Sequence, residues 1–449
     1  MSEYPLVSGR ALDDILAWRP EGAVTVRDFL SDARAVAACL PDGTGVLNLC
    51  EDRYRFAVVF AACLLTGKTS LQPSSQSVET LRQIMRDYPG VFCVTDGAFE
   101  APGLDLPRLD FPDLSALERP AVDRMPMIAA DRVVAILFTS GSTGLPQPQA
   151  KTWGKLVLNG RAEARGLGLE QTPHVLIGTV PVQHSYGFES TFLLALHGGC
   201  CFWSGKPFYP QDVVGALQAV PGPRMLVTTP YHLSALLSSG LALPAVDKWL
   251  SATAPLSTEL AAQAERQSGA PVHEIYGSTE SSQLASRRTT DGAAWQLLPG
   301  VALAQEGDTT FAQAGHVEGR VPLSDIIELL PDGRFLLHGR HADLVNIAGK
   351  RTSLAYLNHQ LCAIEGVQDG AFFLPDEDAR DGVTRLTAFV VAPGLARADL
   401  VAALRQRIDA IFMPRPLVLV DGLPRNSTGK LPRSGLQALY QNRVSDGQR

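Results

Sequence analysis

The sequence lacks several features that would assign the chain to a membrane, a nucleic acid or a structural metal. Its longest apolar run, residues 56–65, is far shorter than the roughly 20 residues needed to span a bilayer. No basic cluster stands out and the net charge is -7, so we expect no nucleic-acid partner and no anionic membrane. The seven cysteines include no Cys-x-x-Cys pair, which disfavours a zinc site or a disulfide framework. Residues 1–5 lack the pattern of a signal peptide, so we expect a cytoplasmic protein.

Length and periodicity predict an α/β protein. A chain of 449 residues, 45% of them hydrophobic, can form two or three domains with substantial cores. Short apolar runs with the character of buried strands alternate with segments of helical spacing, which favours largely parallel sheets flanked by helices. The predicted helices are 26–40 and 78–86, and the predicted strands are 46–49, 91–94, 175–178, 224–227 and 272–275. No internal repeat is present, and the proline-rich segment 102–126 is predicted to be a surface connector.

One loop has the composition of a phosphate-binding site. It follows the apolar run 133–137 and contains only hydroxyl residues and glycines: Thr139, Ser140, Gly141, Ser142, Thr143 and Gly144. Such a loop presents backbone N–H groups and hydroxyls with little side-chain bulk, as phosphate binding requires. An ordinary glycine-serine turn is the alternative.

A second segment of this type, 424–430, allows a P-loop to be tested on spacing. A P-loop needs a glycine, four residues, and then Gly-Lys-Ser or Gly-Lys-Thr. Here Gly429-Lys430 is followed by Leu431, and the position five before Gly429 is Pro424. The first loop contains no Gly-Lys at all, so the P-loop hypothesis is excluded.

The two segments and four others, in the same order, resemble the motifs of the adenylate-forming superfamily of acyl-CoA synthetases, aryl-acid ligases and peptide-synthetase adenylation domains. The four are residues 181–187 (Pro-x-x-His-x-x-Gly), 251–256 (a small-residue turn before proline), 276–280 (Tyr-Gly-x-Thr-Glu), and Asp325 with 331–334 and 339–340. The resemblance implies a large N-terminal adenylation domain, 1–339, and a small mobile α+β domain, 340–449, with a hinge between them.

The resemblance also implies roles in ATP binding. The loop 139–144 would hold the β- and γ-phosphates, Tyr276 would stack on adenine beside Gly277, and Asp325 with Arg340 would bind the ribose. Thr279 would contact the α-phosphate, and Glu280 would hold Mg²⁺. The turn residues Thr253, Ala254 and Pro255 would complete the nucleotide site.

Ordinary structural roles remain open for several of these residues. Tyr276 could be a core tyrosine, Glu280 and Arg340 could be solvated, and Asp325 could cap a helix over 326–328.

Lys430 is the residue that the resemblance makes catalytic. It would bridge the attacking carboxylate and the α-phosphate, which is an interaction made mainly in the transition state. A surface lysine near a frayed chain end is the alternative. After adenylation, the segment 345–351 would replace the lysine loop. Gly349 would then line the passage for the pantetheine thiol, unless it is a simple turn residue, and Arg351 would contact phosphate.

Two further groups of residues bear on the reaction: those that match the acid pocket of the family, and those that depart from the family pattern. The residues that match pocket positions are His184, Tyr186, Phe188, Ser251, Ala252, Thr253 and Ile275. His184 would also act near the reacting acid, although a satisfied core histidine is the alternative. The usual loop lysine is replaced by Gln147, for which Lys151 could substitute in part, and a usual hinge acid is Ala342.

The expected function is ATP- and Mg²⁺-dependent acid–thiol ligation through an acyl-adenylate. The short chain, Gln147-Pro148 and the segment 151–154 look like the ligases of aryl-polyene (xanthomonadin-type) pigment biosynthesis clusters. That resemblance implies a small hydroxybenzoate-type acid and, as acceptor, the phosphopantetheine of an acyl carrier protein, with free CoA second. A fatty acyl-CoA synthetase and a non-catalytic nucleotide-binding protein are the alternatives. No sequence feature indicates the oligomeric state.

Overall fold

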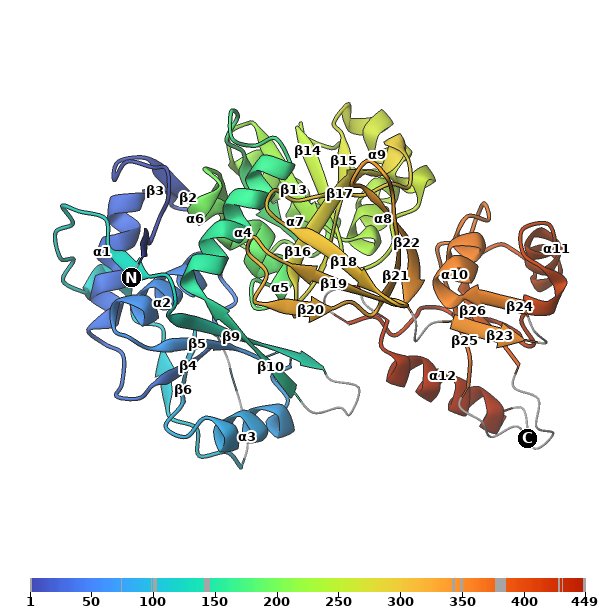
Figure 1. The fold of residues 1–449 in the computed structure, drawn as a ribbon, viewed down its shortest axis with the longest axis horizontal. Coiled ribbons are helices and arrows are strands. Elements are labelled where there is room, and N and C mark those ends of the chain that lie inside the picture. Colours follow the sequence, from blue (N-terminus) through green and yellow to red (C-terminus); the bar gives the residue numbers. More distant parts are fainter. Residues whose placement is uncertain are drawn as a thin grey trace.

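Two large sheets and a smaller C-terminal part make up the fold (Figure 1). The computed structural model describes residues 2–73, 75–97, 99, 103–140, 146–340, 344–347, 350–375, 385–426, 429 and 431–446. The large part, coloured blue to yellow, contains both sheets, and the orange and red C-terminal part lies at one end of it.

The first sheet has six strands in the order β10-β9-β5-β4-β6-β7. Its inner pairs are parallel, and β9 and β10 form an antiparallel edge. The strands are β4 (Gly45–Asn48), β5 (Thr69–Gln72), β6 (Phe92–Thr95), β7 (Arg108–Asp110), β9 (Val133–Ser140) and β10 (Pro146–Thr152). The N-terminal strand β1 (Glu3–Pro5) pairs with β8 (Met127–Ala129), the strand that precedes β9 in the chain.

The second sheet has nine strands in the order β17-β16-β15-β14-β13-β11-β12-β2-β3. The run from β15 to β2 is parallel, and antiparallel pairs close both edges. The strands are β2 (Ile15–Arg19), β3 (Gly22–Thr25), β11 (Val175–Gly178), β12 (Cys201–Trp203), β13 (Arg224–Thr228), β14 (Lys248–Ser251), β15 (Val272–Ser278), β16 (Ser282–Arg288) and β17 (Gln296–Leu297).

Helices cover both faces of this sheet, which explains the uninterrupted apolar runs in its inner strands, residues 175–178 of β11 and 225–227 of β13. Successive side chains point to opposite faces, so Met225 and Val227 join one core cluster while Leu226 joins another. The helices of the large part are α1 (Val26–Ala37), α2 (Arg53–Leu65), α3 (Val78–Asp87), α4 (Trp153–Gly166), α5 (Ser185–Gly187), α6 (Leu194–His197), α7 (Pro210–Ala219), α8 (Pro230–Ser238) and α9 (Thr258–Ser268). A π-helical turn, Phe188–Leu193, joins α5 to α6, and 3₁₀ turns span Leu114–Ala116 and Thr289–Asp291.

Antiparallel hairpins lead from the large part to the C-terminal one. They are β18 (Ala302–Glu306), β19 (Thr309–Gln313) and β20 (Arg320–Pro322), followed by β21 (Asp325–Leu329) and β22 (Phe335–Arg340). The C-terminal part has its own core clusters. Its elements are β23 (Leu344–Ile347), β24 (Lys350–Ser353), α10 (Leu354–Cys362), β25 (Asp369–Phe373), β26 (Thr387–Val391), α11 (Arg397–Arg405), a 3₁₀ turn (Ala410–Phe412), β27 (Leu417–Leu419) and α12 (Arg433–Asp446).

The predicted α/β class with largely parallel sheets is confirmed, and the two predicted helices and five predicted strands are all present. Local signals account for the ends of some elements. Helix α1, for example, begins at a capping box in which the Thr25 hydroxyl accepts from the Asp28 N–H. Within the described ranges, no helix is long and apolar enough to cross a membrane.

Candidate active site

Several of the predicted site segments meet at the carboxyl ends of neighbouring parallel strands. Thr228 ends β13 and Ser251 ends β14, and the two are register partners. Ser251 is paired in turn with Glu274, two residues before Tyr276 on β15. In open α/β sheets this edge is where ligands bind. Motifs that are separate in the sequence therefore lie together at the carboxyl ends of the parallel strands in the nine-stranded sheet.

The predicted phosphate loop joins two antiparallel strands. Thr139 lies opposite Gln147 and Ser140 lies opposite Pro146, and the Thr139 hydroxyl donates to the Gln147 carbonyl at 3.5 Å. Gln147, which stands where the family has its loop lysine, is exposed. The predicted phosphate contacts of Gly141, Ser142, Thr143 and Gly144 lie outside the described residues and stay predictions.

Tyr276 and Asp325 are in direct contact, although 49 positions separate them. The Tyr276 hydroxyl donates to Asp325 Oδ2 at 2.8 Å, and the Tyr276 ring packs against Trp295 and Phe335 with centroid distances of 5.8 Å to each. Arg340 is the cross-strand partner of Asp325 in the β21–β22 hairpin. The three residues predicted for adenine and ribose are therefore brought together.

Asp325 does not cap a helix. It begins strand β21, so the N-cap alternative considered for this residue is wrong. The apolar spacing of 326–328 suits a helix and a strand equally over so few residues, and pairing with β22 decides for the strand.

Gly277 is required by the tight hairpin that carries Thr279 and Glu280. The register between β15 and β16 shifts at Gly277, and a methyl group there would lie 2.3 Å from the Ser282 carbonyl oxygen and 2.7 Å from Gln283 Cα. No side chain fits in that space. The glycine of the motif thus lets β16 return close to β15, which holds Thr279 and Glu280 half-buried at the sheet edge.

Glu280 is the predicted magnesium ligand. In the described part of the chain, no group of three or more His, Cys, Asp or Glu side chains could hold a metal ion. Mg²⁺ commonly binds through one or two carboxylates plus substrate phosphates, rather than in an all-protein cage. One carboxylate at the turn fits that mode, in which the ion would reduce the negative charge of the phosphates.

The predicted acid pocket contains a firmly held aromatic ring. The Tyr186 hydroxyl lies 3.1 Å from the Thr228 carbonyl oxygen and 2.9 Å from that of Leu250, and burial raises the pKa of Tyr186 well above its usual value. His184 is half-buried at the start of α5, and Ile275 is buried on β15. The neutral phenol therefore stays fixed to the ends of β13 and β14.

Phe188, a predicted pocket residue, packs within an aromatic core cluster. It is fully buried, and its ring packs on Phe56, Phe60 and Phe192 at centroid distances of 6.2, 5.4 and 5.5 Å. Its place is thus beneath α5, among side chains of α2 and the π-helical turn.

The small-residue turn after β14 has an unusual backbone. Thr253 adopts the left-handed region with φ 77°, which is rare for a β-branched residue and is found at functional sites. The buried carboxylate of Glu274 anchors the turn, because it accepts from the Leu256 N–H at 3.1 Å and from Arg287 Nε at 2.7 Å. Ser251 is fully buried before the turn, which also contains Ala252, Ala254 and Pro255.

The loop before Lys430 lies against the large part. A methyl group at Gly429 would be 3.2 Å from Thr229 Oγ1 and 3.4 Å from Tyr231 Cβ, at the start of α8. Gly429 has a left-handed backbone, φ 74°. The lysine loop therefore approaches the edge where Thr228 and Tyr186 lie. Lys430 itself lies outside the described residues, and its catalytic role stays a prediction.

The segment predicted for thiol transfer is a hairpin. Strand β23 pairs with β24 so that Asn346 lies opposite Arg351 and Ile347 opposite Lys350, and Lys350 forms an ion pair with Asp409. Gly349, the predicted thiol-passage residue, lies outside the described residues. Neither its role nor that of Arg351 is tested by this arrangement.

Sequence reasoning missed the residues that support the site. Arg287 lies 4.5 Å from the ring of Trp295 and binds Glu274, so it connects the Tyr276 cluster with the Thr253 turn. The sequence around Trp295 contains no motif. Its role in packing against Tyr276 is visible only in the tertiary structure, where Phe335 lies beside both rings.

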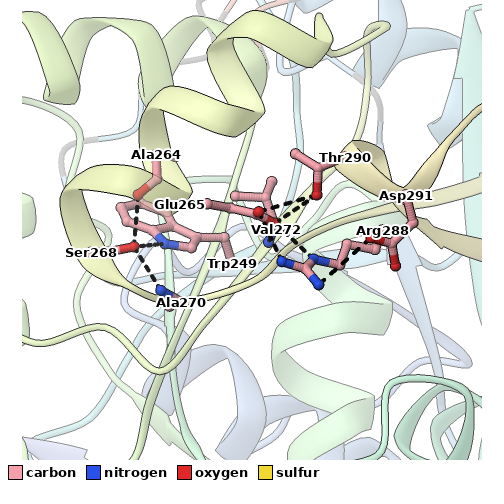
Figure 2. Close-up of polar contacts among 9 residues, drawn as sticks. All are labelled: Trp249, Ala264, Glu265, Ser268, Ala270, Val272, Arg288, Thr290 and Asp291. Carbon is pink, nitrogen blue, oxygen red and sulfur yellow. Dashed lines mark hydrogen bonds and ion pairs between the residues drawn. The ribbon is translucent and has the colours of Figure 1, made fainter.

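A surface hollow beside α9 is separate from this site. Figure 2 shows the polar contacts there: Glu265 accepts from Arg288 at 2.9 Å and from the Val272 N–H at 2.9 Å, and Ser268 accepts from Trp249 Nε1 at 2.9 Å. None of the predicted site residues lines the hollow. These contacts fix α9 to β14, β15 and β16, and so support the strands that carry the motifs.

Comparison with protein families gives two matches. Residues 9–306 match the family described as AMP-binding enzyme, and residues 359–430 match the AMP-binding enzyme C-terminal domain.

Individual proteins match over much of the chain. A 4-coumarate–CoA ligase from Rhodobacter capsulatus is 31% identical over 301 residues, covering 66% of this chain and 74% of that protein. An o-succinylbenzoate CoA synthetase from Bacillus subtilis, solved with its acyl-adenylate, has a TM-score of 0.82 at 20% identity and covers 97% of this chain and 99% of its own. A benzoate CoA ligase from Burkholderia xenovorans has a TM-score of 0.78 at 17% identity, with 95% and 97% covered. At these identities the two structures establish the fold alone.

Proposed function

Because this chain belongs to the AMP-binding enzyme family of AMP-forming acid–thiol ligases, we propose that it activates a small aryl acid of the hydroxybenzoate type. ATP-dependent activation of a carboxylic acid is the chemistry of the family. The finer proposal is that the acyl group then passes to the phosphopantetheine thiol of an acyl carrier protein, with CoA as the second acceptor. The cytoplasmic location and the 1–339 and 340–449 domains remain predictions.

The proposed reaction has two balanced steps. A carboxylate oxygen of the acid attacks the α-phosphorus of ATP, and the bond to the bridging oxygen breaks to release pyrophosphate and leave acyl-AMP. A thiolate then attacks the acyl carbon, and AMP leaves as the thioester forms. The first step brings two anions together, so the site must hold them in place and stabilise the developing charge. We assign that stabilisation to Lys430 and Thr279, and cation binding to Glu280.

The observation that carries the aryl-acid proposal is the fixed ring of Tyr186. Its hydroxyl lies against the Thr228 and Leu250 carbonyls, so the ring has little freedom to move aside for a long flexible chain. A rigid aromatic wall with few polar groups suits a flat acid. Several relatives are named for aromatic acids, 4-coumarate, 2-succinylbenzoate and salicylate, which supports this proposal.

The proposed acceptor is a phosphopantetheine thiol. Curated relatives are named CoA ligases, which supports a pantetheine thiol of some kind. The resemblance of Gln147, Pro148 and the segment 151–154 to the short aryl-polyene ligases favours the carrier-bound form. Both forms present the same thiol on the same arm, so the adenylation site is compatible with either.

The first experiment measures acid-dependent pyrophosphate release from ATP and Mg²⁺ across hydroxybenzoates, cinnamates and fatty acids of increasing length. A preference for hydroxybenzoates supports the proposal, and a preference for aliphatic acids moves the assignment to fatty acid activation. Thioester formation with a phosphopantetheinylated carrier protein and with CoA, at equal thiol concentration, then compares the acceptors. Absence of release with every acid would contradict the proposal.

A further inference from the structure

Lys151 is a buried cation behind the Tyr-Gly-x-Thr-Glu motif. It lies near the end of β10, and only 2% of its surface is exposed. Its Nζ donates to Ser282 Oγ at 3.0 Å and lies 3.4 Å from the Glu280 carbonyl oxygen. Both partners belong to the hairpin turn that presents Thr279 and Glu280.

Three carboxylates interact electrostatically with this ammonium group. Burial lowers the pKa of Lys151, and the charges of Glu189, Glu318 and Glu280 oppose that shift. Glu189 is itself 2% exposed and accepts from Ser185 Oγ at 2.6 Å and from the Gln283 N–H at 3.0 Å. The charge of Lys151 is thus compensated within the site, as a buried cation requires.

Lys151 cannot take the place of the missing loop lysine. Gln147, at that position, is exposed, and four residues of strand place Lys151 about 13 Å further along β10. Its side chain is already engaged by the turn after β15.

The turn itself needs support from outside. Ser282 has a left-handed backbone with φ 60°, a conformation that costs a non-glycine residue free energy and persists only where neighbours hold it. The hydrogen bond from Lys151 is made to this serine's hydroxyl, and the Glu189 carboxylate holds the N–H of the next residue.

We propose that Lys151 is a positioning residue that fixes the Thr279–Glu280 turn, so that the Glu280 carboxylate is presented to the cation bound with the phosphates of ATP. This inference rests on the nucleotide part of the proposed function and is independent of which acid is used. Lys151 would act through Glu280 and would not touch the reacting atoms.

The test is isothermal titration of the wild type and Lys151→Met with Mg²⁺-ATP, and separately with AMP in EDTA, without any acid. Loss of a charge-assisted hydrogen bond on the turn should weaken Mg²⁺-ATP binding about tenfold, while AMP affinity stays within about twofold. The matched control is Lys155→Met. Lys155 donates to the Gly315 carbonyl at 2.7 Å, away from the motif, so both affinities should stay within about twofold.

Two further variants keep the test decisive if Lys151→Met does not fold because Glu189 is left uncompensated. Lys151→Met/Glu189→Gln removes both charges, and Ser282→Ala removes one contact of the ammonium; both should weaken Mg²⁺-ATP selectively. In a Glu280→Gln background the Lys151 effect should disappear, since contributions that act through one group are not additive. Equal loss of both ligands, or unchanged Mg²⁺-ATP binding, would overturn the inference. If only acid-dependent turnover fails in the wild type, the aryl-acid proposal is wrong and this one stands.

Discussion

At the scale of single residues, the loop that carries Lys430 is held by one arginine. Arg425 binds the Asp369 carboxylate through two hydrogen bonds of 2.7 Å and donates to the Gly429 carbonyl at 2.8 Å. The pair is about one-fifth exposed, and Asp369 raises the pKa of Arg425 against the effect of its burial. A planar guanidinium can make all three bonds at once, which an ammonium cannot.

Replacing Arg425 should therefore reduce adenylation without touching the nucleotide site. We expect Arg425→Ala to lower acid-dependent pyrophosphate release about tenfold, because a misplaced catalytic group costs rate even when the misplacement is small. Arg425→Lys should recover only part of it. ATP affinity measured by titration should stay unchanged, and a parallel loss of that affinity would contradict this account.

Lys430→Ala tests the catalytic assignment directly. Removing a group that stabilises transition-state charge should lower pyrophosphate release on the order of 10²-fold. ATP affinity should change little, because the interaction is made mainly in the transition state. Near-normal release from a folded variant would show that another group supplies the charge.

At the scale of elements, Arg53 of α2 joins the carboxyl ends of β11 and β12. It is 1% exposed, and its guanidinium donates to the carbonyls of Trp203 and Gly205 at 3.0 and 2.8 Å and to those of Gly178 and Val180 at 3.3 and 3.1 Å. Burial lowers the pKa of Arg53 to about 10, so it stays charged at neutral pH. The segment that leads to His184 and Tyr186 begins at these carbonyls.

Arg53→Met should be strongly destabilising. Several buried carbonyls would lose their donor, which we expect to cost about 3 kcal/mol or more in the free energy of unfolding. The fall in the thermal unfolding midpoint measures this. Arg55→Met on the same helix is the control. Arg55 makes one long bond, 3.4 Å, to the Asp96 carbonyl and lies 5.5 Å from the ring of Phe111, so its loss should lower the midpoint far less.

The sequence predicted the helices and strands of the large part well. Central strands of the nine-stranded sheet, such as β11 and β13, are short and mostly apolar, so periodicity and composition agree there. Asp325 shows the limit, because 326–328 is too short for periodicity to separate helix from strand. Pairing with β22 makes this segment a strand, and the propensity of residues 326–328 contains no information about that partner.

At the scale of the whole molecule, buried histidines should make the fold sensitive to acid. Burial lowers the pKa of His197 to about 3 and the pKa values of His232, His273 and His316 to about 4. The unfolded chain binds these protons near the usual pKa of about 6.5, so stability is full above that value and is lost as pH falls toward 4. Carboxylates whose pKa is raised by burial act in the opposite sense; they are Glu163, raised to about 8, and Asp32, Asp52 and Glu189. Burial also lowers the pKa of His174, which adds to the effect of the four histidines.

Thermal unfolding midpoints from pH 7 to pH 4.5 test this balance. We expect the midpoint to fall steadily through that range, and His197→Gln to reduce the slope because its neutral amide takes up no proton. His338→Gln is the control, since His338 is exposed and forms a surface pair with Glu328. A midpoint that rises on acidification would mean that Glu163 and other carboxylates dominate.

The sequence by itself determined the chemistry. The composition of the hydroxyl-glycine loop predicted phosphate binding before any fold was known. The resemblance of the Tyr-Gly-x-Thr-Glu and Ser-Thr-Gly-Lys segments to family motifs predicted the adenine, cation and catalytic roles. Only the tertiary structure decided how these groups are held: Tyr276 on Asp325, Glu274 beneath the Thr253 turn, Lys151 behind Glu280, and Arg425 of the lysine loop on Asp369. Each of these contacts joins residues far apart in the chain, and neither spacing nor propensity at one segment contains information about a partner that arrives from another strand.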